Sequence, residues 1–569
     1  MRAAECATSR TSRATSLVKT VLLVGGYGVF GGRLSRLLAG ERGLRLVVAG
    51  RSLERAQRFC MAHGGVPLAF DRDGDLREQL GGIAPAIVID AAGPFQSYGS
   101  EGYRLARAAL ETGAHYLDLA DDADFALGIG TLDEVAKATG RVAISGARRV
   151  PAISSAAADA LVGGLSRVTL IESVILPGNR APRGLSVVRA VLSQVGKPIR
   201  LWRGGEWTTA PGWSALRRTD LQGAIERRWC AFIGAPDLVL FPPRYGARSV
   251  LFRAGLELPV LHLGLWLASW GPRLGIVRSL EPFAEPLRWI AKPTRSFGSD
   301  RGGMIVTVVG RDAAGQPVRR TWSLVVEAGD GPFVPAIPAY LLTRKILNVC
   351  PTAGARPCVG ELTLGEIEEG LTRLLATTQR AEALAPTLYE RILGQDHERL
   401  PAVIRGLHDV HDWESYVGQA MVVKGHSWFA RLCARLLRLP KDADRVPVRV
   451  TIERYGDGER WTHQFGAQVF CSRMERPRDD APGVIVEQFG PLSLRMRLPV
   501  DGQGLSMPIE RTDLFGFRLP SWLTPIGHMR ETVDSAGRFW FDVDIALPGV
   551  GRIIRYAGWL IPSGKQTAQ

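Results

Sequence analysis

The chain has 569 residues, 46% of them hydrophobic and 22% charged, which excludes a small peptide module and a disordered chain and predicts several folded domains. Its 71 Lys and Arg residues outnumber 56 Asp and Glu residues, for a formal net charge of +15. The basic residues are spread thinly, without a dense basic block interleaved with aromatic residues, so we predict no nucleic-acid partner.

The cysteines and the N-terminal segment favour a cytoplasmic protein. The 7 cysteines are scattered, without a C-x-x-C pair or metal-ligand spacing, so we assign no metal site and expect a reducing compartment. Residues 1–18 lack the apolar core of a secretory signal and are interpreted as a disordered tail, with a transit peptide as the alternative.

Residues 19–150 have the pattern of a Rossmann-type dinucleotide-binding domain. Short apolar runs alternate with helical segments, which is typical of a parallel sheet covered on both faces. The fold class predicted here is therefore α/β, with a doubly wound parallel sheet. Its strands are expected at 20–25, 44–50, 66–70, 86–91, 116–119 and 142–145.

Two further domains are predicted after residue 150. Longer and more polar strands at 168–176, 304–309 and 319–327 indicate a mixed α+β substrate domain over 151–379, whose last helices return to the first domain. Residues 384–569 are expected to begin with helices, up to about residue 439, and to continue as an antiparallel β domain. Apolar and polar residues alternate there as they do in strands with one buried face.

The strongest local signal is a G-x-G-x-x-G motif between the first strand and the first helix. Its first glycine permits the tight turn, its second lets the backbone approach a pyrophosphate, and its third lets the helix pack closely on the strand. With the free N–H groups of the helix, the motif predicts a dinucleotide site; a glycine-rich turn without a ligand is the alternative. The predicted phosphate-binding residues are Gly25, Gly26, Gly28, Val29, Phe30 and Gly31.

Residues at the ends of later strands favour NADP over NAD. Arg51 and Ser52 stand where an NAD site has an acidic residue, and a guanidinium with a hydroxyl suits a 2′-phosphate. The alternative is an exposed Arg51 beside a helix-capping Ser52. Asp71 is expected to face the adenine or to begin a loop. The cofactor-lining residues after the fourth strand are predicted to be Ala92, Gly93 and Pro94.

Candidates for catalysis and substrate binding follow the fifth and sixth strands. Tyr116 and Asp118 end the fifth strand, near the expected nicotinamide, so either is a candidate acid or base. The alternative is a structural role for both. Arg148 and Arg149 are candidates to hold a substrate carboxylate or phosphate; the alternative is that they are exposed surface arginines.

An apolar run starts at Leu258 and ends at Trp270. It is shorter than a bilayer-spanning helix. A buried core helix, a peripheral membrane contact and the wall of an apolar substrate tunnel are the three interpretations.

Several segments resemble the saccharopine dehydrogenase-like NADP-binding oxidoreductase family. They are VGGYGVFGG, AGR, DAAGPFQSYG, HYLDLADD and GARRVPAISSAAADAL, in this order. The tail, with WTHQFGAQVF and VEQFGPLSLRMRLP, resembles a domain of unknown function that follows such oxidoreductases in bacteria. The family has an aromatic-acid-serine run where this chain has Gly146-Ala147-Arg148-Arg149 before Val150-Pro151, so no acidic role is carried over to that loop.

The resemblance implies an NADP-dependent oxidoreductase that transfers a hydride between nicotinamide and a small-molecule or lipid-like substrate. One alternative is a trans-acting enoyl reductase of lipids or polyketides. Another is a non-catalytic NADP(H)-binding sensor or membrane-associated scaffold. A homodimer is a further expectation, and membrane association is the alternative to a purely cytoplasmic location.

Overall fold

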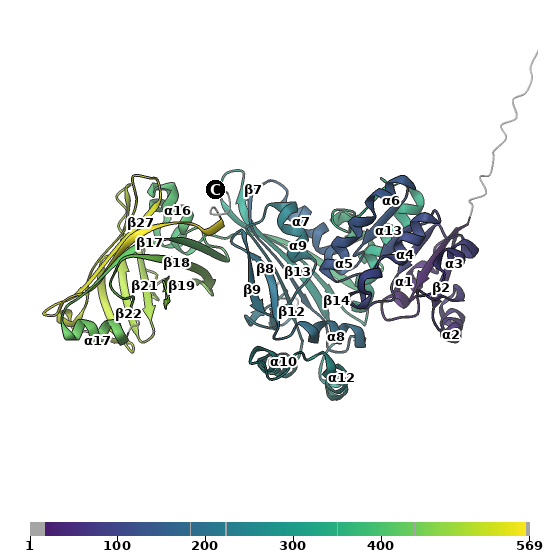
Figure 1. The fold of residues 1–569 in the computed structure, drawn as a ribbon, viewed down its shortest axis with the longest axis horizontal. Coiled ribbons are helices and arrows are strands. Elements are labelled where there is room, and N and C mark those ends of the chain that lie inside the picture. The colour runs from purple at the N-terminus through teal and green to yellow at the C-terminus, as the bar shows by residue number, and fades with distance from the viewer. Residues whose placement is uncertain are drawn as a thin grey trace, which may run out of the picture.

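The computed structural model describes residues 18–564 except 183, 222, 224, 350 and 437–438. Three sheets lie in a row along the molecule, the parallel sheet at one end, a mixed sheet in the middle and an antiparallel sheet at the other end (Figure 1). The predicted succession of an α/β, a mixed α+β and an antiparallel β domain is confirmed. The predicted N-terminal tail lies outside the described residues, apart from Val18.

The first sheet has seven parallel strands in the described part of the chain, in the order β15-β6-β5-β4-β1-β2-β3. Alternate residues of β1 join different apolar clusters, Val21 and Leu23 one and Leu22 the other, because helices cover both faces. The strands are β1 (Lys19–Val24), β2 (Leu44–Gly50), β3 (Val66–Ala69), β4 (Ile87–Asp90), β5 (His115–Asp118), β6 (Val142–Ser145) and β15 (Gly354–Pro357). The helices are α1 (Gly31–Leu38), α2 (Leu53–His63), α3 (Leu76–Ile83), α4 (Arg104–Glu111), α5 (Ala123–Gly128) and α6 (Asp133–Ala138).

The order of this sheet reverses between β1 and β4, where open α/β sheets form a ligand crevice at the carboxyl ends of their strands. The chain returns to this domain after leaving it. Helix α13 (Ile337–Asn348) contacts α1, and the short strand β15 extends the sheet by pairing with β6. Helix α14 (Leu364–Leu371) packs on α13.

The middle sheet contains nine strands within 18–564, with β7 and β12 parallel and its other pairs antiparallel. The expected domain end at residue 379 falls inside β16, which pairs with β14 up to Leu384. The strands are β7 (Leu165–Leu176), β8 (Pro198–Arg203), β9 (Glu206–Pro211), β10 (Arg217–Thr219), β11 (Arg228–Phe232), β12 (Ser249–Gly255), β13 (Gly302–Asp312), β14 (Pro317–Val326) and β16 (Ala376–Leu384). The helices are α7 (Ser154–Val162), α8 (Leu185–Gln194), α9 (Asp237–Tyr245), α10 (Pro259–Ala268), α11 (Trp270–Arg273) and α12 (Ala284–Ala291).

The C-terminal domain is a curved antiparallel sheet of twelve strands among the described residues (Figure 1). Its helices are α15 (Leu388–Leu393), α16 (Ala402–Leu407) and α17 (Trp428–Leu436). Between α16 and α17, where helix was expected, the chain forms a long strand, β17. The strands are β17 (Trp413–Lys424), β18 (Ala443–Tyr455), β19 (Gly458–Phe465), β20 (Gln468–Glu475), β21 (Val484–Phe489), β22 (Leu492–Arg497), β23 (Gly504–Ser506), β24 (Ile509–Leu514), β25 (Phe517–Arg518), β26 (Ile526–Val533), β27 (Phe539–Leu547) and β28 (Gly551–Pro562).

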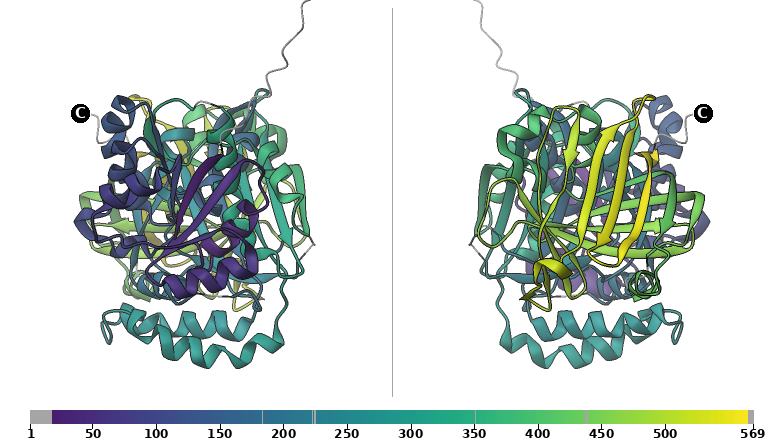
Figure 2. Two further views of the ribbon diagram at one scale, coloured as in Figure 1. Left: turned by 90° about the vertical axis from the view of Figure 1, so that its right-hand side faces the viewer. Right: turned by 90° about the vertical axis from the view of Figure 1, so that its left-hand side faces the viewer.

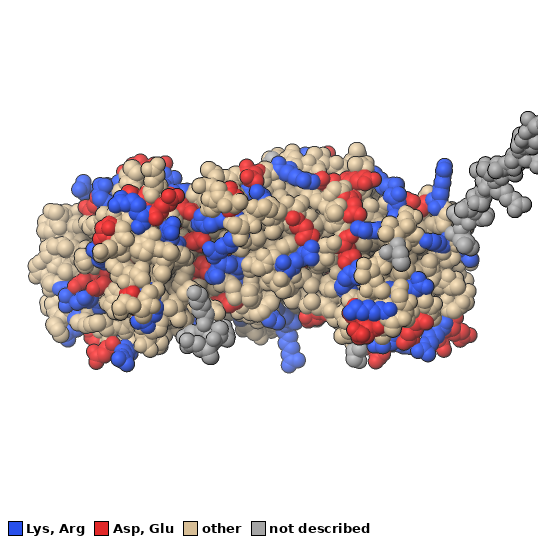
Figure 3. Space-filling view, turned by 90° about the horizontal axis from the view of Figure 1, so that it is seen from above, with Lys and Arg blue, Asp and Glu red and all other residues tan. Residues whose placement is uncertain are grey.

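Ion pairs join the middle and C-terminal domains. Arg203 Nη2 lies 2.7 Å from Asp412 Oδ1 and 3.1 Å from Glu453 Oε1, and Arg311 Nη2 lies 2.7 Å from Asp409 Oδ1. On the outer surface, residues of both charge signs are interspersed along the upper face of the whole molecule (Figure 3).

Candidate functional site

The loop between β1 and α1 is held in one shape by two glycines. Gly25 has a φ of +76°, and a Cβ there would lie 2.8 Å from the backbone of Ala92. A Cβ on Gly31 would lie only 2.2 Å from the carbonyl oxygen of Gly25. The loop therefore packs against the end of β4 and the start of α1 with no room for a side chain at either position.

The same loop leaves space where a dinucleotide phosphate would lie. A Cβ on Gly28 would meet only the Gly25 oxygen, at 3.1 Å. No side chain caps the N-terminus of α1, whose N-cap is Phe30. The Gly32 and Arg33 N–H groups donate to the Gly28 and Phe30 carbonyls, whereas the Gly31 N–H has no acceptor among the described residues and is left for a ligand. Val29 and Gly26 complete the loop, and the Gly26 carbonyl accepts a hydrogen bond from Ser35. These residues fit a pyrophosphate group.

At the end of β2, Ser52 has the helix-capping role of one interpretation, and Arg51 has the exposed position that both interpretations allow. The hydroxyl of Ser52 accepts a hydrogen bond from the Arg55 N–H at 3.3 Å, so Ser52 caps α2. The Ser52 N–H donates to the hydroxyl of Tyr27, whose ring lies 5.1 Å from the Arg55 guanidinium. Arg51 is exposed and forms no ion pair with a described residue, so its guanidinium is available to a ligand.

Asp71 follows β3, which is separated in the sheet from β4 by β1 and β2. The Asp71 carboxylate accepts a hydrogen bond from the Asp73 N–H at 3.1 Å, so this aspartate begins a loop. Ala92 lies beside Gly25, on the edge of the sheet that faces the α1 loop, and the Gly93-Pro94 segment continues along this edge. The structure thus brings the glycine loop together with Ala92.

Asp90, at the end of β4, anchors a buried polar cluster that the sequence did not reveal. Its carboxylate lies 3.3 Å from the Arg72 guanidinium, which stacks 3.6 Å from the ring centre of Tyr98. Burial raises the pKa of Asp90, and the charge of Arg72 opposes this effect. The only sequence signal for this cluster was an acidic residue at the end of an apolar strand.

Tyr116 and Asp118, the candidate acid or base residues, are both buried at the end of β5. Tyr116 is 1% exposed, in the apolar cluster beneath α4. The Asp118 carboxylate accepts hydrogen bonds from Ser145 and from the N–H groups of Gly146 and Ala120, which ties the end of β5 to β6. Burial raises the pKa of Asp118 to about 7. This burial and these hydrogen bonds favour the structural interpretation of both residues, and the acid or base role stays a prediction.

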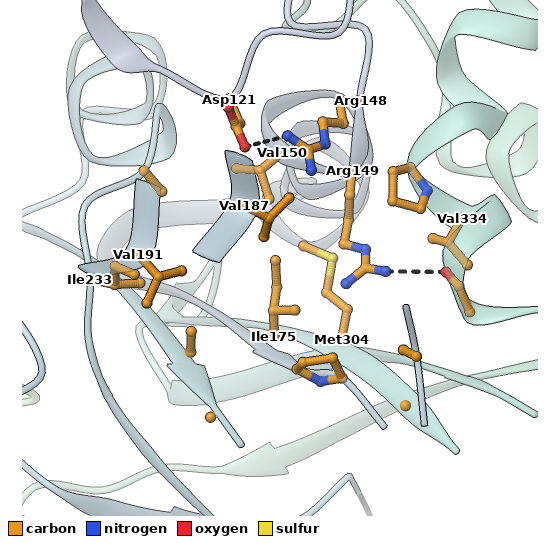
Figure 4. A pocket seen from close by; sticks show the side chains of 18 of the residues that line it. Asp121, Arg148, Arg149, Val150, Ile175, Val187, Val191, Ile233, Met304 and Val334 are labelled. Carbon is orange, nitrogen blue, oxygen red and sulfur yellow. Dashed lines mark hydrogen bonds and ion pairs between the residues drawn. The ribbon is translucent and has the colours of Figure 1, made fainter. Parts of the chain in front are cut away.

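A cavity of about 310 Å³ lies between the first domain and the middle sheet (Figure 4). It begins at Phe30, next to the glycine loop, and Asp121, Arg148 and Arg149 line it from the ends of β5 and β6. Apolar side chains of the middle domain form most of its other walls. These include Ile175, Val187, Val191, Ile233, Phe252, Met304, Leu324 and Val334.

The two arginines predicted to bind substrate both face this cavity, but only one has a charged partner. Arg148 forms an ion pair with Asp121, and its guanidinium lies 4.2 Å from the ring centre of Phe30. Arg149 donates a single 3.4 Å hydrogen bond to the Gly331 carbonyl, and its Nε has no partner among the described residues (Figure 4). Burial, with a smaller effect of Arg148, lowers the pKa of Arg149 to about 10, so it stays charged at neutral pH.

The apolar walls of the cavity were missed because they come from distant segments. Val187 and Val191 lie on α8, Met304 on β13 and Val334 near the start of α13. Each is an ordinary apolar residue in the sequence, and only the packing of the middle sheet against the first domain brings them together.

Two histidines of the C-terminal domain, His408 and His411, lie far along the chain from this site. His408 Nε2 is 2.7 Å from Glu531, and its ring stacks on Tyr389, while His411 Nε2 is 3.5 Å from Asp409. No group of three or more metal-ligating side chains occurs in the part of the chain that the structure describes.

Comparison with known proteins identifies both ends of the chain. Residues 21–144 match the family described as Saccharopine dehydrogenase NADP binding domain, and residues 400–560 match the family described as Domain of unknown function (DUF4166). No curated protein sequence matches the chain.

Solved structures are similar in fold only. The apo, histidine-tagged saccharopine dehydrogenase (L-Glu forming) from Saccharomyces cerevisiae is 14% identical, covering 64% of this chain and 100% of that chain, with a TM-score of 0.47. A biliverdin reductase from Synechocystis, in complex with biliverdin and NADP+, is 13% identical over 62% of this chain and 96% of that chain, with a TM-score of 0.29. The chain is thus similar to the saccharopine dehydrogenase NADP binding domain near its N-terminus and to DUF4166 near its C-terminus.

Proposed function

We propose that this protein is an NADP-dependent oxidoreductase whose substrate is an apolar molecule with one anionic group. The observation that carries the proposal is the cavity. It is mostly apolar, it starts at Phe30 beside the dinucleotide loop, and it contains the half-buried Arg149, which has no acidic partner among the described residues and whose Nε is enclosed without a partner.

The cofactor would lie along the carboxyl edge of the first sheet. The loop around Gly28 and the N-terminus of α1 would hold the pyrophosphate, and Arg51 would pair with the 2′-phosphate that distinguishes NADP from NAD. When bound, the nicotinamide supplies or accepts the hydride. Phe30, which lines the cavity, would lie between the phosphate site and the substrate.

The residues around the cavity would bind and orient the substrate. A half-buried guanidinium without a carboxylate partner favours an anionic ligand, because removing an unpaired charge from water is costly. Arg149 would hold the carboxylate or phosphate of the substrate, while the ion pair of Arg148 with Asp121 closes the cavity near Phe30. The apolar walls would exclude water from the reacting carbon. A lipid-like substrate has this combination of an apolar body and an anionic group, and an enoyl reduction is one hydride transfer that such a site would support.

The test is NADPH oxidation with a panel of medium-chain α,β-unsaturated acids, oxo acids and their methyl esters. We expect turnover of at least one acid and much weaker turnover of its ester. Arg149→Gln is expected to raise KM for the acid at least tenfold while NADPH affinity is unchanged, because the charge-assisted hydrogen bonds are lost.

Arg58→Gln is the matched control, since Arg58 is an exposed arginine of α2 paired only with Glu54. Equal KM values for the Arg149→Gln variant and the wild type would contradict the substrate assignment.

A non-catalytic NADP(H)-binding sensor is the second candidate. This candidate is favoured because neither Tyr116 nor Asp118, the two candidate acid or base residues, is among the described residues that line the cavity. The oxidation assay separates the two candidates: both bind NADPH in calorimetric titration, but a sensor oxidises it with no member of the panel.

A further inference from the structure

Helix α10 is apolar all round, yet it is not buried. Its ten residues, Pro259–Ala268, include no charged side chain, and His262 is its only buried residue. Val260 is 71% exposed and Leu267 is 66% exposed. A helix that is apolar on every face is ordinarily enclosed by protein or in contact with lipid.

The segment that follows α10 extends this exposed apolar surface. Figures 1 and 2 show α10 and α12 projecting together below the middle sheet, as a layer of their own. On α12, Ala284 faces the protein, whereas Trp289 is 77% exposed. We call residues 259–297 the apolar platform. Its exposed large apolar side chains are Val260, Leu267, Trp270, Leu274, Ile276, Phe283, Trp289, Ile290 and Phe297.

The charges of the apolar platform are mainly positive. Its five cations are Arg273, Arg278, Arg288, Lys292 and Arg295, and its two acids are Glu281 and Glu285. Glu285 lies 3.7 Å from Arg189 of the protein body. No acidic side chain among the described residues pairs with Arg288 or Lys292, which flank the exposed Trp289. The upper face of the molecule, in contrast, mixes both signs (Figure 3).

We propose that the apolar platform docks on the surface of an anionic lipid bilayer. Its aromatic and aliphatic side chains would enter the boundary between headgroups and acyl chains, and its cations would pair with anionic headgroups. No helix among the described residues is long and apolar enough to span a membrane, so the contact is a peripheral one. Nine exposed large apolar side chains gathered on one layer of the fold indicate an interaction surface rather than ordinary surface composition.

The platform is also connected to the cavity. Helix α12 packs on α8, and α8 contributes Val187 and Val191 to the cavity wall. A membrane-docked protein would therefore hold its cavity next to the lipid phase. This connection rests on the proposed function, whereas docking itself does not.

The test is flotation of the full chain with vesicles of phosphatidylglycerol and phosphatidylcholine, compared with vesicles of phosphatidylcholine alone. We expect binding to the anionic vesicles that weakens at high salt. The double variant Trp289→Glu with Ile290→Glu is expected to bind at least tenfold less, and Arg288→Gln with Lys292→Gln is expected to lose the preference for the anionic vesicles.

Met61→Glu is the control, because Met61 is 80% exposed on α2 of the first domain. Circular dichroism and thermal unfolding verify that each variant is folded, without using the cofactor, so a failure of docking is separate from a failure of the oxidoreductase proposal. Absence of vesicle binding by the wild type, or equal losses for Met61→Glu, would overturn the proposal. So would a dimer in light scattering that Trp289→Glu converts to monomer without any vesicle binding.

Discussion

Gly28 and Gly31 belong to one motif, but their surroundings differ. A side chain on Gly31 would overlap the Gly25 carbonyl, so Gly31→Ala is expected to destabilise the fold by roughly 1–3 kcal/mol. A side chain on Gly28 would enter the space of the pyrophosphate. Gly28→Val is therefore expected to abolish NADPH binding with little change in Tm. Calorimetric titration and thermal unfolding check the pair, and unchanged affinity in a folded Gly28→Val variant would remove the cofactor site from this loop.

Arg51 is the residue that we propose to favour NADP over NAD. Hydrogen bonds from a charged group are worth about 1.5–3 kcal/mol, and NADH has no 2′-phosphate to accept them. Arg51→Ala is expected to lower the ratio of NADPH to NADH affinity by about tenfold or more. Arg45→Ala, an exposed arginine of β2, is the control. Equal losses for both cofactors would show that Arg51 does not contact the phosphate.

Asp118 gives the folded state a pH dependence. Its folded pKa of about 7 lies above the usual value of about 3.9, so between these values the folded state binds more protons than the unfolded state. The contribution of Asp118 to the free energy of unfolding therefore falls as the pH rises through this window. Asp118→Asn is expected to flatten the pH profile measured by urea unfolding, whereas Asp71→Asn, an exposed control, should leave it unchanged.

At the scale of elements, local sequence was sufficient where a strand is built around a continuous apolar run. β2 and β6 have the predicted bounds because each contains such a run, residues 46–49 in β2 and 142–144 in β6, between polar segments. β15 is only four residues long and contains Gly354 and Pro357, so nothing local marks it; it is a strand because it pairs with β6. β17 was expected to be helical, but it pairs with β18 on one side and β28 on the other.

β16 decides where the first two domains can be cut from the third. It pairs with β14 along its full length, and Ala385 still donates a hydrogen bond to the Pro317 carbonyl. A chain ending at Ala385 is expected to be soluble and to bind NADPH, because every proposed cofactor contact precedes residue 150. A chain ending at Leu375 should aggregate, since it exposes the edge of β14. Size-exclusion chromatography and NADPH titration compare the two, and loss of NADPH binding in the longer, folded fragment would place part of the nucleotide site in the C-terminal domain.

At the scale of the whole molecule, ion pairs rather than apolar packing alone hold the C-terminal domain in place. Arg203 is 11% exposed on its side chain and contacts two carboxylates of that domain. Arg203→Leu leaves both carboxylates without this partner and is expected to weaken docking by about 3–5 kcal/mol. Limited proteolysis between β16 and α15 should then be faster. Arg200→Leu, on the same strand but stacked on Trp207, is the control and should not change the rate.

The late position of β15 in the chain affects the order in which the domains can complete their folding during synthesis. A ribosome has completed β6 at residue 145, but it adds β15, the outer neighbour of β6, only at residues 354–357. During synthesis of the intervening two hundred or so residues, the nascent nucleotide-binding domain has an unpaired edge at β6. The middle domain must therefore emerge before the first domain can be finished, although the first domain precedes it in the chain.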